Sequence, residues 1–219
     1  MTILPRYFRA FRDVPEWPYG IRAKAIKLRV EDEDEYNYLG LYNAILSHVF
    51  QTSTMPFSVT PSFLSPGLRT QVNIPPATFL VYHRDRPVLI LQINPPHRIQ
   101  DPIARQHAEW NLKEQIQALR DQFVTSTVWA CSCFGKWLSY YELSPSGPQG
   151  YEWAQWGSDV GFDKPDGGKD KSPLKRWDTN VLMPDGRKRL FDVVDKIRDM
   201  VDGLGDENVD LEGREQEES

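Results

Sequence analysis

The sequence predicts an α/β fold in a single domain, with a central mixed β-sheet flanked by helices. Two patterns support this prediction: short β-branched and aromatic runs of strand length, and longer stretches with apolar residues at helical spacing. A chain of 219 residues suits one domain with a buried core. Because 40% of the residues are hydrophobic, the composition excludes a wholly disordered or fibrous protein.

The first predicted helix covers residues 33–50, and the acidic cluster 31–35 lies at its N-terminal end, where carboxylates favour a helix. Three predicted strands follow, at 57–64, 78–83 and 88–94. The second and third form a hairpin through the turn at 84–87. The third strand is the most apolar, so we expect it at the centre of the sheet, ending at the prolines that follow Asn94.

The second helix is predicted over residues 102–123, with Asp101 as its N-cap and Pro102 at its first position. A second hairpin is then predicted, with strands at 127–134 and 137–143 around a Gly-Lys turn. The rest of the chain is predicted as a long loop at 144–180, which packs through Trp153, Trp156 and Trp177, and a closing helix from Leu190 to Leu204 after the turn Pro184-Asp185-Gly186.

The two ends of the chain carry opposite charges. Residues 1–29 hold seven Lys and Arg against two acids, a local +5, and residues 205–219 hold seven carboxylates against one Arg, a local −6. We therefore expect a basic, aromatic arm over 1–30, a folded domain over 31–204 and a disordered acidic tail over 205–219. The aromatic residues expected to pack the arm against the domain are Tyr7, Phe8, Phe11, Trp17 and Tyr19.

Nucleic acid is a candidate partner of the arm through Arg6, Arg9 and Arg12, although the whole chain, with a net charge of −5, is not strongly basic. The first residues contain no apolar run long enough for a signal peptide or a membrane span. Cys131 and Cys133 lie at i and i+2, a spacing without disulfide geometry on a strand. We expect reduced thiols in a cytoplasmic or nuclear protein that does not enter a membrane.

The predicted order, α-β-β-β-α-β followed by one more strand and a helix, matches the core of the PD-(D/E)xK (restriction-endonuclease-like) nucleases. Several stretches also resemble an uncharacterised family of proteins from mushroom-forming fungi (basidiomycetes). The resemblance spans about residues 31–200 and rests on residues 35–43, residues 87–96, Arg105 with Ala108-Glu109, Cys133-Phe134-Gly135 with Tyr140-Tyr141, and residues 170–178.

In that family the third strand reads Glu-Ile/Leu-Lys-Pro-Pro, and the strand before it begins with Asp-Phe. The resemblance implies that the Asp and the Glu hold Mg²⁺ and that the Lys positions or activates water. The corresponding residues here are Thr78, Gln92 and Asn94, which carry no charge. The resemblance also marks Glu35, an acidic position in many such enzymes, and Asn111, where the family commonly has Gln. We expect neither a metal nor another cofactor.

Gln92 and Asn94 point to the same face of their strand, and three interpretations of them stay open. They bond each other, Thr78 and the start of the second helix, as buried polar groups usually do. Alternatively, they line a ligand-binding cleft together with Thr78, Arg105, Glu109, Glu35 and Asn111. In the third interpretation the catalytic carboxylates have moved to Asp85, Asp101 or Glu109.

The cysteines are interpreted as core thiols. A zinc site of Cys131 and Cys133 with His83 or His97 has the wrong spacing, because structural zinc motifs separate paired cysteines by two to four residues. A Cys133 nucleophile with His107 as its base rests on composition alone. His48 is expected to be structural.

Three functions follow from these observations. The first is a catalytically degenerate pseudonuclease that acts as a binding or regulatory module, with a small molecule or a protein as its partner. The second is an enzyme of another class, for small-molecule transformation in a fungal biosynthetic pathway, that reuses the cleft with Glu35 or Glu109 as an acid or base. The third is a residual metal-dependent nuclease.

Overall fold

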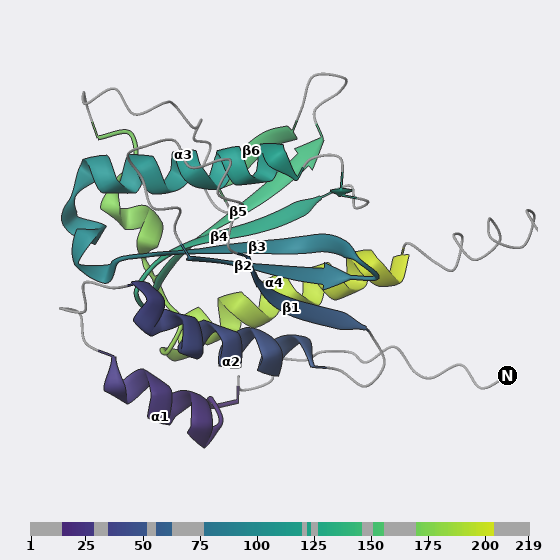
Figure 1. The fold of residues 1–219 in the computed structure, drawn as a ribbon, viewed down its shortest axis with the longest axis horizontal. Helices are drawn as coiled ribbons and strands as arrows, with labels where there is room; N and C mark the ends of the chain where they lie inside the picture. The colour runs from purple at the N-terminus through teal and green to yellow at the C-terminus, as the bar shows by residue number, and fades with distance from the viewer. Residues whose placement is uncertain are drawn as a thin grey trace, which may run out of the picture.

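The computed structural model describes residues 15–28, 35–51, 56–62, 77–119, 122–123, 127–145, 151–155 and 170–203. A mixed β-sheet forms the centre of the molecule, with helices on both faces (Figure 1). Helix α3 (Pro102–Ala118) covers one face, and α2 (Leu39–Phe50) and α4 (Pro184–Gly203) cover the other. This arrangement confirms the predicted α/β class.

The main path of the sheet has the order β1-β2-β3-β4-β5-β6. The bounds are β1 Phe57–Ser62, β2 Ala77–His83, β3 Arg86–Asn94, β4 Val128–Phe134, β5 Trp137–Pro145 and β6 Tyr151–Gln155. A two-residue strand, β7 (Thr179–Asn180), pairs with the start of β5. The pair β3 and β4 is parallel and the other pairs are antiparallel. Helix α3 connects the parallel strands, which a tight turn cannot join.

The two predicted hairpins are confirmed. The turn between β2 and β3 places Arg84 and Asp85 at positive φ, 47° and 63°. The turn between β4 and β5 uses Gly135 at φ +60°, where an added Cβ would lie 2.6 Å from the Cβ of Pro96. Strand β3 is buried from Pro87 to Asn94 and lies between β2 and β4, as its apolar sequence predicts.

The larger core cluster lies between the sheet and the helices α2 and α4. The predicted first helix is confirmed from residue 35, as the 3₁₀ turn η1 (Glu35–Tyr38) followed by α2, while residues 33–34 lie outside the described residues. The apolar stripe of α4 is buried as predicted, at Leu190, Val193, Val194, Ile197 and Val201. A smaller cluster between α3 and the sheet includes Leu112 and Ile116.

The described part of the predicted arm contains a helix, α1 (Tyr19–Lys27), which packs against α2. Trp17 is buried, as predicted: its indole N–H donates to the backbone oxygen of Val181 over 2.9 Å, and its ring stacks on Phe191. The edge of the Trp17 ring also meets His48. The prediction for Tyr19 is wrong, because this side chain points outward from α1 and is 79% exposed.

Three other predictions need correction. Helix α3 ends at Ala118 rather than at 123. The predicted loop at 144–180 contains β6, the 3₁₀ turn η6 (Leu174–Trp177) and β7. The residues predicted as the turn Pro184-Asp185-Gly186 form the first turn of α4, because proline suits the first position of a helix. Trp177 is buried as predicted.

Several predictions fall outside the described residues. These are the roles of Tyr7, Phe8, Phe11, the three arginines of the arm, the strand ends at 63–64, the side chains of Trp153 and Trp156, Leu204 and the acidic tail. The domain boundaries at 30 and 204 therefore stay predictions. Within the described ranges, no helix has the length and apolar character needed to cross a membrane.

Candidate functional site

A set of polar side chains lies between α3 and the sheet, in the interior of the molecule. All of its members are buried, and the least buried, Asn94, is 6% exposed. We call this set the polar layer; it consists of Thr78, Gln92, Asn94, Arg105, Glu109, Gln115, Ser132, Tyr141, Ser172 and Arg176. Buried polar groups at this density are unusual unless hydrogen bonds join them, so their partners define what the site can do.

The sheet brings Thr78, Gln92 and Asn94 together. Thr78 of β2 lies directly opposite Gln92 of β3, and Gln92 lies opposite Ser132 of β4. Asn94 follows Gln92 by two residues and so shares its face of the sheet. This face is the one that α3 covers, since Ile90 on the same face packs with Leu112 and Ile116 of α3. Sequence periodicity predicted the shared face correctly.

A chain of amide hydrogen bonds links these residues. The Gln92 Nε2 donates to Asn94 Oδ1 over 2.9 Å, and the Asn94 Nδ2 donates to Ser132 Oγ over 3.2 Å and to the Cys133 backbone oxygen over 3.0 Å. Thr78 Oγ1 donates to Gln115 Oε1 of α3 over 3.2 Å. The interpretation that these residues bond each other is thus partly correct, but the partner on α3 lies in its last turn and not at its start.

One atom among these hydrogen-bonded side chains has no partner among the described residues. The Gln92 Oε1 accepts no hydrogen bond from any residue that the structure describes, although the side chain is 0% exposed. A buried acceptor without a donor costs about 1–3 kcal/mol of stability. The polar layer therefore contains a free acceptor at the position where the resemblance implies a metal-binding carboxylate.

Glu109 is the centre of the second half of the polar layer. Its carboxylate accepts a hydrogen bond from Tyr141 Oη over 2.9 Å and another from Ser172 Oγ. Nη1 of Arg176 lies 2.6 Å from both carboxylate oxygens. Burial raises the pKa of Tyr141 well above its usual range, and the negative charge of Glu109 adds to this increase, so the phenol stays protonated and donates.

Arg105 holds α3 to the segment that precedes η6. Its Nε donates to the Ser172 backbone oxygen over 2.6 Å, its Nη1 to the Ile99 backbone oxygen over 2.7 Å, and its Nη2 to Asp170 Oδ2 over 2.5 Å. All three nitrogens of the guanidinium are therefore used inside the protein. Arg105 is part of the predicted cleft, but its geometry is that of a structural clamp.

The structure does not bring the other two predicted site residues into these bonds. Asn111 is half-buried on α3, and no hydrogen bond joins it to the polar layer among the described residues. Glu35 lies in η1, and its side chain lies outside what the structure describes. Of the predicted acid or base candidates, Glu109 alone has a described environment.

The alternative carboxylates lie elsewhere. Asp85 is exposed in the β2–β3 turn, at the other end of these strands from Thr78 and Gln92. Asp101 is the N-cap of α3, as predicted, and accepts from the Ile103 backbone N–H over 2.9 Å. Desolvation opposes the change, but hydrogen bonds from the backbone of Ile103 and Ala104 and from Arg98 lower the pKa of Asp101. Neither residue joins the polar layer.

The thiols of Cys131 and Cys133 are buried on the opposite face of the sheet, which α2 and α4 cover. Burial raises the pKa of both thiols, so they stay protonated, and Cys133 donates to the Gln92 backbone oxygen. His107 belongs to α3, on the other side of the sheet, so the nucleophile–base pair does not form. Among the described residues, no three His, Cys, Asp or Glu side chains form a metal-sized group.

Sequence reasoning missed five members of the polar layer: Gln115, Ser132, Tyr141, Ser172 and Arg176. The resemblance did mark residues 170–178 and Tyr141, but nothing in the sequence named Glu109 as their partner. No protein-family model, no curated protein and no solved structure matches this chain.

Proposed function

We propose that this protein is a catalytically degenerate nuclease-fold protein that acts as a binding or regulatory module through its former active-site cleft. The order α2-β1-β2-β3-α3-β4, with a parallel pair β3–β4, supports a nuclease-like core. The resemblance then assigns the two metal-binding carboxylates and the catalytic lysine to Thr78, Gln92 and Asn94.

The chemistry of these three residues argues for a role without a metal. Mg²⁺ binds through carboxylates and retained waters, and a hydroxyl and two neutral amides do not replace them. The remaining carboxylate of the polar layer, Glu109, is neutralised by Arg176 and held by Tyr141. A general acid or base needs a proton position that substrate can reach, so the buried ion pair also disfavours an enzyme of another class.

The side chain of Gln92 carries the proposal. Its amide nitrogen donates a hydrogen bond to Asn94, and its amide oxygen has no partner among the described residues. Since buried acceptors in folded proteins are almost always paired, we propose a small polar ligand that donates a hydrogen bond to Gln92 Oε1.

Native mass spectrometry of the gently purified protein tests this function. We expect a copurifying small molecule on the wild type and its loss from Gln92→Leu. The control Gln117→Leu, at an exposed glutamine of α3, should keep the molecule. We also expect no heat of Mg²⁺ or Mn²⁺ binding in calorimetry. Divalent-dependent cleavage of DNA or RNA by the wild type would reject the proposal in favour of a residual nuclease.

A further inference from the structure

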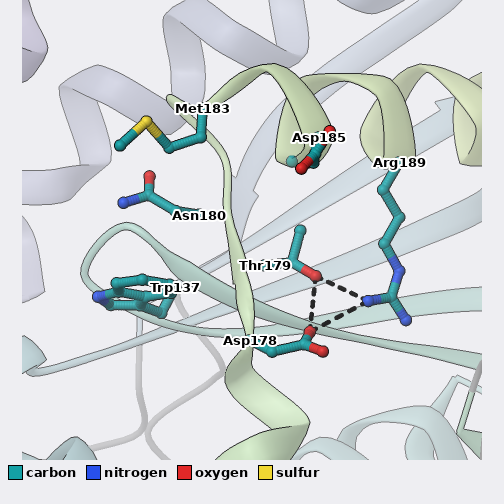
Figure 2. A pocket seen from close by; sticks show the side chains of 8 residues that line it. Trp137, Asp178, Thr179, Asn180, Met183, Asp185 and Arg189 are labelled. Atoms are coloured by element: carbon teal, nitrogen blue, oxygen red, sulfur yellow. Dashed lines mark hydrogen bonds and ion pairs between the residues drawn. The ribbon is translucent and has the colours of Figure 1, made fainter.

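A cavity of about 440 Å³ lies outside the polar layer, at the corner where β7 meets the start of α4 (Figure 2). It is formed by the first residue of β5, the segment that carries β7, and the first turns of α4. Its lining includes Trp137, Asp178, Asn180, Met183, Asp185 and Arg189.

Backbone contacts fix the shape of this corner. Asn180 pairs with Trp137 across β7 and β5, and the backbone N–H of Met183 donates to the Asn180 oxygen over 3.0 Å. Gly186 packs so closely that an added Cβ would lie 1.9 Å from the same oxygen. The cavity is therefore preformed, which lowers the entropy that a ligand loses on binding.

Two large apolar side chains that line the cavity are exposed to solvent. Trp137 is 41% exposed and Met183 is 59% exposed, and both lie on one side of the view in Figure 2. A flat indole and a flexible thioether are suited to an aliphatic chain and, at the indole face, to a cation. Exposed apolar residues of this size beside a cavity indicate a binding surface, because a ligand that covers them removes apolar area from water.

The guanidinium of Arg189 is already engaged by protein groups. Its Nη1 donates to Thr179 Oγ1 over 2.7 Å and lies 3.2 Å from Asp178 Oδ1, and its Cζ is 5.1 Å from the ring centroid of Tyr140. The dashed lines in Figure 2 mark this triad of Asp178, Thr179 and Arg189. Arg189 is thus committed to the protein and is not the group that would receive an anion.

The charge that faces solvent is negative. The side chain of Asp178 is 64% exposed, and Asp185 is exposed in the first turn of α4. Two carboxylates against one guanidinium leave the lining with a net charge of −1. Asp185 also offsets the partial positive charge of the helix N-terminus, which would otherwise repel a cation.

From these observations we infer that the cavity binds an alkyl-linked cation, an ammonium or a guanidinium group. The cationic group lies by the carboxylates of Asp178 and Asp185, and its alkyl chain packs on Trp137 and Met183. A free polyamine and a Lys or Arg side chain of a partner protein share this chemistry. The inference uses none of the residues of the polar layer and does not depend on the proposed function.

Titration of the full chain, followed by NMR through the indole N–H of Trp137, tests the inference. This signal is assigned by its loss in Trp137→Leu. NMR is used because a fluorescence signal would combine all seven tryptophans of the chain. The probes are spermidine, the blocked peptide Gly-Arg-Gly and, as the anionic control, hexanoate. We expect at least one of the two cations to shift the Trp137 signal. Tighter binding of spermidine would indicate a free polyamine as the ligand, and tighter binding of the peptide would indicate a side chain of a partner protein.

The variants decide which groups bind. Asp185→Asn should weaken binding about two- to five-fold, as for one exposed ion pair, and added salt should weaken it further. The matched control is Asp199→Asn, an exposed aspartate about 20 Å further along α4, which should leave binding unchanged. The inference is overturned if neither cation shifts the signal, if hexanoate shifts it equally, or if the two variants behave alike.

Discussion

One guanidinium nitrogen of Arg176 lies 2.6 Å from both carboxylate oxygens of Glu109, and both side chains are nearly inaccessible to solvent. The two residues are 67 positions apart and join η6 to the middle of α3. A buried pair of this kind adds little net stability, because removing two charges from water offsets their attraction. Removing only one of the two residues, however, leaves the other charge buried without a partner.

Breaking this pair should therefore be far more harmful than replacing it. We expect Glu109→Leu to lower the free energy of unfolding by about 3–5 kcal/mol, because Arg176 stays buried without its counter-charge. The double variant Glu109→Leu with Arg176→Met should lose less than the sum of the single variants. Urea unfolding of the four proteins gives the coupling energy.

The exposed pair Lys188–Asp192 on α4 is the control for that cycle, and its coupling should stay below about 0.5 kcal/mol. Equal coupling energies for the buried and the exposed pair would contradict the role given to Glu109.

Three buried tyrosines should make the protein sensitive to alkali. Burial raises the pKa of Tyr42, Tyr140 and Tyr141 well above the usual value. Below about pH 10 both states hold these protons, so stability is unaffected. Above it the unfolded chain releases them first, and the free energy of unfolding falls by about 1.4 kcal/mol per pH unit for each tyrosine until the folded state also ionises.

Urea midpoints between pH 8 and 11 measure this slope. Tyr42→Phe should flatten it by one tyrosine's share, and should cost about 1 kcal/mol at neutral pH because the 2.7 Å hydrogen bond to the Gly135 oxygen is lost. Tyr19→Phe, at a side chain that is 79% exposed, is the matched control. A slope that Tyr42→Phe does not change would refute the buried, protonated phenol.

Gly186 should not tolerate a side chain. The Cβ of Gly186→Ala would overlap the Asn180 backbone oxygen, so α4 must move, and we expect a loss of about 1–3 kcal/mol. Gly203→Ala in the last turn of the same helix meets no atom within 4 Å and should be neutral or stabilising. Thermal unfolding compares the two, and equal melting temperatures would contradict the close contact between α4 and β7.

Two carboxylates introduced at Thr78 and Gln92 test the proposed nuclease origin of the polar layer. Thr78 and Gln92 are cross-strand partners, so Thr78→Asp with Gln92→Glu places two carboxylates side by side in the interior. We expect a protein at least about 3 kcal/mol less stable than the wild type in a chelator, because neither charge is paired. Mn²⁺ or Mg²⁺ at ten times the dissociation constant should return about 1.4 kcal/mol.

The neutral double variant Thr78→Asn with Gln92→Asn is the control and should show no metal response in thermal unfolding. A charged variant that metal does not stabilise would count against a former metal site at these positions.

The local elements were predictable from the sequence because each carries its own signal. The hairpin of β2 and β3 follows from two apolar runs with a short turn, and the start of α3 from Asp101-Pro102. The shared face of Gln92 and Asn94 follows from the period of a strand, so their hydrogen bond could also be predicted from the sequence.

The rest depends on partners that are distant in the sequence. The strand β7 has two residues, too few for a pattern, and it exists because β5 pairs with it. Arg176 lies in a stretch whose composition predicts a loop, and nothing near it in the sequence indicates its partner Glu109. Pro184-Asp185-Gly186 has the composition of a turn, but proline also suits the first position of a helix, and the contact of Gly186 with the distant Asn180 has no signal in the sequence.

The hydrogen bond from Trp17 to Val181 joins residues that are 164 positions apart. During synthesis, Trp17 can reach this acceptor and, two turns into α4, its stacking partner Phe191 only after the ribosome has made the residues between them. Domains that rely on such distant contacts complete their folding late. Trp17 thus gains these two buried contacts late in folding, and until then its indole stays available to chaperones.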